Sequence, residues 1–102
     1  MTNEEVISWI LYAISLATGQ GPVSQSEISH VADGINHAVP TGAEFKLAFG
    51  WLISNGWVAC AERKYFVTSK GSEAMERARR GRTTTMSVWK ALVVEVRNAS
   101  AA

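Results

Sequence analysis

The chain has 102 residues, of which 47% are hydrophobic and 19% are charged. This composition supplies one core, is too short for two independent domains, and excludes an intrinsically disordered chain. The formal net charge of +1 is unevenly divided: residues 1–60 carry one basic and five acidic side chains, a net of −4, whereas residues 61–102 carry nine basic and four acidic ones, a net of +5. Attraction to a negatively charged partner is therefore expected from the C-terminal part.

The apolar run VISWILYAISLA predicts a first helix over Asn3–Ala17, which ends at the Gly- and Pro-containing TGQGP. Only a narrow polar stripe of Ser8, Tyr12 and Ser15 interrupts its apolar surface. A helix of this kind needs cover on more than one side.

The first helix and its flanking charges also indicate the cellular compartment. Glu4 and Glu5 precede the apolar run where a signal peptide needs positive charge, and the run is shorter than the roughly 20 residues that cross a bilayer. Cys60 is the only cysteine, so no intrachain disulfide can form. We therefore expect a cytoplasmic protein without contact with a membrane.

Two sequence motifs mark the starts of the next helices. SQSE (residues 24–27) and TGAE (residues 41–44) both have the spacing of a capping box, in which two side chains satisfy free backbone N–H groups. The first motif predicts a helix over Gln25–His37. The second predicts a helix over Gly42–Asn55, which Gly56 closes as a left-handed cap.

A small hairpin and two helices follow. The runs WVAC (residues 57–60) and YFVT (residues 65–68) are rich in aromatic and β-branched residues and flank the polar AERK, which predicts two short strands. Thr68 can cap a helix over residues 69–80. A last helix begins near Thr84 or Thr85, and its apolar stripe repeats at helical spacing.

This order of elements resembles the winged-helix variant of the helix-turn-helix, in the manner of small MarR-like and PadR-like bacterial regulators. The resemblance is carried by ISHVADGI, PTGAEFKLAFGWLISNGWV and YFVTSKG. It implies an α+β, mostly α fold: a single winged-helix domain over residues 1–102, with a core at 24–80 and a short β-hairpin wing. The flanking helices at 1–18 and 84–99 are the elements through which such regulators often form homodimers.

The resemblance also implies how DNA would be contacted. The outer face of the third helix would enter the major groove, and the hairpin would touch the backbone or the minor groove. Carried over by position, this assigns nucleic-acid binding to Thr41, Lys46, Arg63 and Lys64. The remaining positions carried over are Gly42, Ala43, Leu47, Gly50 and Trp51 on the helix and Glu62 on the wing.

The third helix departs from what base reading requires. Its core stripe is predicted to be Phe45, Phe49, Leu52 and Ile53, and its outer face offers Lys46, Ser54 and few other donors or acceptors for base edges. Leu47 and Trp51 on that face allow three interpretations. A terminal helix of the same chain covers them, a partner subunit or protein buries them, or they contact thymine methyl groups beside a phosphate contact from Lys46.

Two further surfaces each have two interpretations. The arginines of ERARRGR, Arg77, Arg79, Arg80 and Arg82, either complement the C-terminal dipole of their helix or form a phosphate-contacting edge. The apolar first and last helices either pack within one chain or join two copies, with Trp9, Ile10 and Ile14 against Trp89, Val93 and Val96. We assign partner binding to Leu47, Trp51, Trp89 and Val93.

Enzyme chemistry is not expected. His30, Asp33 and His37 lie on the polar face of one helix, but no Cys or Glu is spaced to complete a metal site. Cys60 lies in a strand without a basic partner, and no phosphate-binding Gly-rich loop or nucleophile motif occurs. We therefore expect no catalytic residues, no metal and no cofactor.

The sequence favours a cytoplasmic transcriptional regulator that binds double-stranded DNA as a homodimer. The alternative is a winged-helix protein-protein interaction module whose Leu47 and Trp51 face docks a protein and does not bind DNA. A third hypothesis is a ligand-sensing module with a pocket between the apolar terminal helices.

Overall fold

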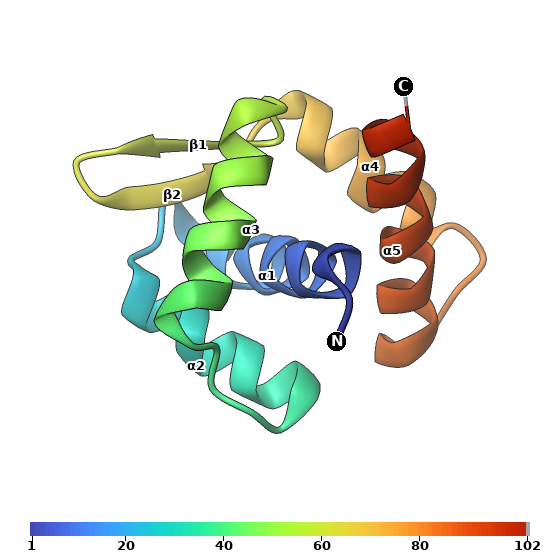
Figure 1. The fold of residues 1–102 in the computed structure, drawn as a ribbon, viewed down its shortest axis with the longest axis horizontal. Coiled ribbons are helices and arrows are strands. Elements are labelled where there is room, and N and C mark those ends of the chain that lie inside the picture. Colours follow the sequence, from blue (N-terminus) through green and yellow to red (C-terminus); the bar gives the residue numbers. More distant parts are fainter. Residues whose placement is uncertain (102) are drawn as a thin grey trace.

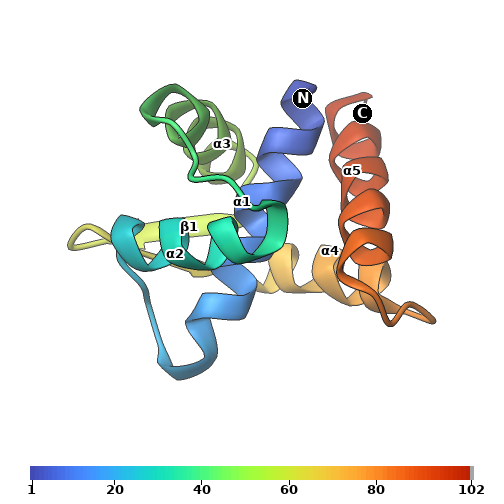
Figure 2. The ribbon, with the colours of Figure 1, turned by 90° about the horizontal axis from the view of Figure 1, so that it is seen from below.

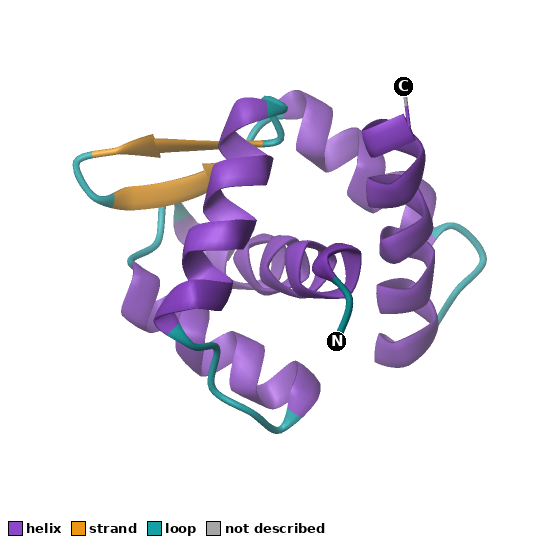
Figure 3. Ribbon diagram, in the orientation of Figure 1, coloured by secondary structure: helices purple, strands orange, loops and turns teal. Residues whose placement is uncertain are grey.

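A computed structural model describes residues 1–101. Helices dominate, and a single antiparallel hairpin projects from them (Figures 1 and 3). The elements are α1 (Asn3–Ala17), a 3-10 turn η1 (Thr18–Gln20), α2 (Gln25–Asn36), α3 (Gly42–Ser54), β1 (Val58–Ala61), β2 (Lys64–Val67), α4 (Ser69–Arg79) and α5 (Thr85–Ala101). The predicted class, α+β and mostly α, is confirmed. None of the described helices combines the length and the apolar character that crossing a bilayer requires.

Helix α1 is the centre of the core. Every residue from Val6 to Ile14 is buried, because α2, α3, α4, α5 and β2 all pack around this helix (Figure 2). The cover that the sequence requires is therefore supplied within one chain. The predicted polar stripe is largely enclosed as well: Ser8 and Tyr12 are buried, and only Ser15 is partly exposed.

Capping boxes start three of the helices. Those at Ser24 and Thr41 are confirmed, and a further box at Thr2 and Glu5 starts α1. In this box the Thr2 hydroxyl accepts from the Glu5 N–H at 3.1 Å, and the Glu5 carboxylate accepts from the Thr2 N–H at 2.7 Å. The predicted helix boundaries consequently hold to within one residue at every capped start.

The hairpin is offset from the prediction by one residue. Val58 pairs with Val67 and Ala61 with Lys64, so the turn contains only Glu62 and Arg63. Both adopt left-handed backbone angles, φ 53° and 64°, which is the geometry of the tightest hairpin turns. On the other side of β2, Val23 forms an isolated bridge with Tyr65, so the segment before α2 lies beside the hairpin.

The start of α4 packs tightly against the entry to β1. A methyl group at Gly71 would overlap the backbone carbonyl oxygen of Trp57 and approach Val67. Only glycine fits at this crossing, which explains a glycine in the first turn of a helix that Thr68 caps.

Candidate functional site

The outward face of α3 is not covered by any other element of residues 1–101. Its core side is formed by Phe45, Ala48 and Leu52, which pack toward α1. The exposed residues of α3 are Gly42, Ala43, Lys46, Leu47, Gly50, Ile53 and Ser54. We call this set the α3 face. It contains a single charged side chain, Lys46.

One expectation about this helix was wrong. Ile53 was predicted in the core stripe, yet its side chain is 44% exposed. At 100° per residue, Ile53 lies 80° from Phe45 around the helix axis, beyond the arc that faces α1. It therefore joins Leu47, which is 36% exposed, on the α3 face.

Trp51 is covered by the chain itself. Its indole N–H donates to the Ser100 hydroxyl on α5 at 3.2 Å, and its ring meets Trp57 edge-on with 5.0 Å between centroids. For Trp51, the first of the three interpretations therefore holds: a terminal helix of the same chain, α5, covers its side chain. Leu47 lacks such cover and remains at the surface.

An aromatic stack fixes α3 against the hairpin. The ring of Phe49 lies parallel to that of Tyr65 on β2, with 4.0 Å between centroids and 5° between planes, and Phe45 stacks on Phe49 from within α3. Burial raises the pKa of the Tyr65 phenol. The α3 face and the hairpin are consequently held side by side.

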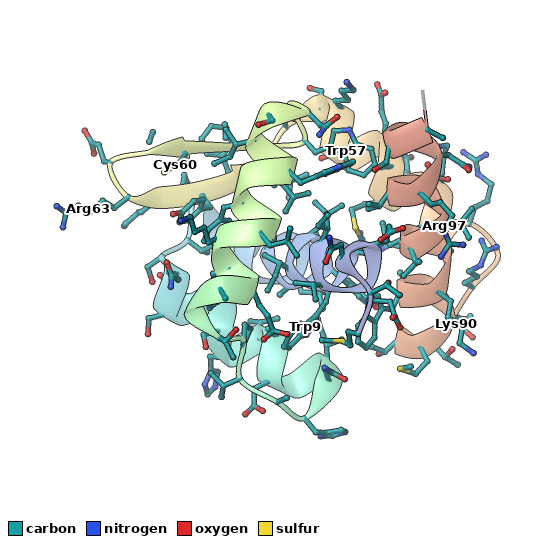
Figure 4. The ribbon with its side chains drawn as sticks, in the orientation of Figure 1. Trp9, Trp57, Cys60, Arg63, Lys90 and Arg97 are labelled. Carbon is teal, nitrogen blue, oxygen red and sulfur yellow. The ribbon has the colours of Figure 1, made fainter. Side chains whose placement is uncertain are left out.

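The tip of the hairpin carries Glu62, Arg63 and Lys64, a net charge of +1. Arg63 extends away from the body of the molecule at the turn (Figure 4), and Lys64 follows it at the start of β2. Within residues 1–101, neither Arg63, Lys64 nor Lys46 forms an ion pair. The backbone N–H and hydroxyl of Ser24 lower the pKa of Glu27, and the charge of Lys64 adds to this effect. Thr41, the fourth predicted residue, accepts the Glu44 N–H through its hydroxyl at 3.1 Å.

Three of the four arginines at the end of α4 have partners for their side chains, and Arg80 is exposed. Arg77 forms an ion pair with Glu95 at 2.8 Å, Arg79 donates to the Ser15 hydroxyl, and Arg82 donates to the carbonyls of Ala78 and Arg80. The connection from α4 to α5 also lies on the side of the molecule opposite the hairpin (Figure 1). These contacts fit the first interpretation of the cluster, in which its positive charge complements the C-terminal dipole of α4.

Trp89 belongs to the core rather than to a partner surface. Its side chain is 6% exposed, and its N–H donates to the Ser8 hydroxyl and to the Glu5 carbonyl, both at 3.1 Å. Trp9 lies 6.3 Å away between ring centroids, and Val93 is partly buried against the same core. The packing of the first helix against the last is therefore observed within one chain.

Hollows in the surface also lie outside the α3 face. A groove of about 590 Å³ along α2 is lined by residues that include Glu27, His30 and Asp33. The described residues contain no group of three or more His, Cys, Asp or Glu side chains that could hold a metal ion. A second hollow of about 460 Å³, between α4 and α5, borders Trp57, whose buried N–H has no hydrogen-bond partner among the described residues.

Comparison of the chain with protein-family models, with curated proteins and with solved structures finds no match in any of the three. The candidate site is therefore defined by its own geometry: an uncovered helix face and an adjoining hairpin whose tip carries two cations.

Proposed function

We propose that this protein binds double-stranded DNA, with the α3 face in the major groove and the hairpin against the backbone, as a cytoplasmic transcriptional regulator of winged helix-turn-helix type. The order of α1, the Val23 segment, α2, α3 and the hairpin supports this proposal. One observation carries it: the stack of Phe49 on Tyr65 holds the hairpin against α3, and both the α3 face and the hairpin tip are exposed. Docking of a helix and a hairpin on a duplex needs this arrangement.

Three cations would supply most of the affinity. Lys46 would contact a phosphate or a base edge from the helix, and Arg63 and Lys64 would contact phosphates from the hairpin. Each neutralised phosphate contributes about −0.9 to the slope of log K against log salt, so three contacts give a slope of about −2.7. Affinity would then fall about 40-fold between roughly 50 and 200 mM salt.

The test is a salt titration of binding to a labelled duplex, followed by fluorescence anisotropy. Replacing Arg63 and Lys64 with alanine should reduce the slope to about −0.9 and weaken binding at low salt. The matched control replaces Lys90 and Arg97 with alanine, which removes the same charge from the outer side of α5, away from the hairpin (Figure 4). If the two double variants lose affinity equally, the hairpin does not face DNA.

A protein-docking module is the second candidate, because Leu47 and Ile53 are exposed on a face with one charge. This candidate requires that binding to random duplex DNA be undetectable at low salt. A pull-down with intact and Leu47→Asp baits would then identify a partner whose capture depends on the α3 face.

A further inference from the structure

The α3 face has an unusual shape as well as an unusual composition. Leu47, Gly50 and Ile53 follow one another at intervals of three residues, so that one apolar side chain lies on each side of a glycine. A methyl group at Gly50 would meet nothing within 4 Å, so packing inside the chain does not require glycine there. A glycine in a helix interior costs about 1 kcal/mol relative to alanine. The backbone of α3 is therefore accessible from outside at Gly50.

The major groove presents one apolar group, the 5-methyl of thymine. Bidentate recognition of guanine or adenine needs Arg, Lys, Asn or Gln, and Lys46 is the only such side chain on the α3 face. Leu47 and Ile53 can contact methyl groups and cannot form hydrogen bonds. The chemistry of this face therefore matches a groove lined with thymine methyls.

A protein partner fits the same face less well. Binding energy at protein interfaces concentrates in Trp, Tyr and Arg side chains. The aromatic residue nearest the α3 face, Trp51, is held against α5 by its hydrogen bond to Ser100. Lys46 on the face and Arg63 at the hairpin tip complement the phosphates that border a groove.

On the basis of the proposed function, we infer that Leu47 and Ile53 are specificity residues that recognise thymine through its methyl group, with Gly50 allowing the close approach. Six residues of helix separate the two side chains by about 9 Å along the axis and by about 120° around it, with Gly50 midway between them. The preferred sites would be rich in A·T pairs.

Uracil tests this inference, since it differs from thymine only by the missing methyl group. The probes are a duplex of A·T pairs, the same duplex with deoxyuridine in place of thymidine, and a G·C duplex with cytosine or 5-methylcytosine. We expect a loss of about fourfold in affinity for each contacted methyl that is removed. We also expect 5-methylcytosine, which places a methyl at the same groove position, to bind more tightly than cytosine.

A variant separates direct contact from altered DNA shape. Leu47→Ala with Ile53→Ala changes two exposed side chains and leaves all cations in place. The preference for thymine over uracil should disappear in this variant while the salt slope stays unchanged. A preference that persists in the variant, or equal binding of thymine and uracil by the unmodified protein, overturns the inference and leaves the proposed function standing. Absence of binding to every duplex overturns both.

Discussion

Helices α1 and α3 are both rich in aromatic and aliphatic residues, yet the structure uses them in opposite ways. Other elements enclose α1, and Trp9 is 1% exposed with its N–H donating to the Ala32 carbonyl at 2.9 Å. Helix α3 buries one side against α1 and leaves the other uncovered. Apolar composition thus serves stability in α1 and is available for recognition in α3. The difference lies in how many neighbours each helix has.

The largest contrast should appear when the same residue type is truncated in both helices. Ile10→Ala on α1 removes a fully buried side chain and should lower the free energy of unfolding by about 2–5 kcal/mol. Ile53→Ala on α3 should change it by no more than about 0.5 kcal/mol. Urea denaturation of both variants gives the two values. Similar losses would mean that Ile53 is buried after all.

Two glycines should respond with opposite signs. Gly71→Ala forces a methyl against the Trp57 carbonyl and should destabilise the fold by about 1–3 kcal/mol. Gly50→Ala places a methyl in open space in the middle of α3 and should stabilise it by about 1 kcal/mol. Thermal unfolding monitored by circular dichroism measures both. A destabilised Gly50→Ala variant would show that the α3 face has a covering neighbour.

The hydrogen bonds of Trp89 to Ser8 and of Trp51 to Ser100 should differ by a smaller amount in their contribution to the free energy of unfolding. Trp89→Phe leaves the buried Ser8 hydroxyl with one partner fewer and should cost about 1–2 kcal/mol. Trp51→Phe removes a bond to Ser100 in an exposed position, where water can replace the lost donor, and should cost less than about 0.5 kcal/mol. A double-mutant cycle of Trp89→Phe with Ser8→Ala isolates the first bond. Coupling near zero would assign the cost to packing alone.

The helix starts should respond to pH. Hydrogen bonds from the N–H and hydroxyl groups of Thr2 and Ser24 hold the pKa of Glu5 and Glu27 below the ordinary value of 4.5. Because the pKa is lowered in the folded state, the stabilisation is present above pH 4.5 and is lost as the pH falls through the folded-state pKa. Glu27→Gln should therefore weaken the acid dependence of the melting temperature relative to the unmodified protein. An unchanged acid dependence in this variant would contradict the capping role.

The last prediction concerns the oligomeric state, for which we expect a monomer. Trp9, Trp89 and their neighbours are buried and have their hydrogen-bond partners within one chain, so they offer no surface to a second copy. We therefore predict a mass of 11.1 kDa in sedimentation equilibrium at micromolar concentrations. A dimer mass would require a contact surface other than α1.

Local signals predicted most of the fold. The SQSE and TGAE motifs located two helix starts, and the Thr2 to Glu5 spacing carries the same signal for α1, although the prediction did not use it. Hairpin and helix order followed from strand and breaker residues. The strands were misplaced by one residue because Trp57 is apolar like a strand residue but packs before β1 begins.

The site was harder to predict because its exposure depends on distant segments. Nothing in the sequence around Trp51 indicates that Ser100 lies beside it, nor does the polar character of Ser8 indicate that Trp89 covers it. Ile53 satisfied the helical spacing of a core residue and was placed inside for that reason. Only tertiary packing decides which part of an apolar circumference remains at the surface.

The turn between β1 and β2 has a final implication. Hairpins of this geometry favour Asn-Gly, because other residues lose roughly 1 kcal/mol or more in left-handed angles. Here Glu62 and Arg63 occupy both positions, so the ladder from Val58 to Val67 and the Val23 bridge must maintain a conformation that the tip itself disfavours. Exchanging the pair for Asn-Gly would give a more rigid loop without its arginine. The protein therefore keeps a guanidinium at its outermost point at the expense of local stability.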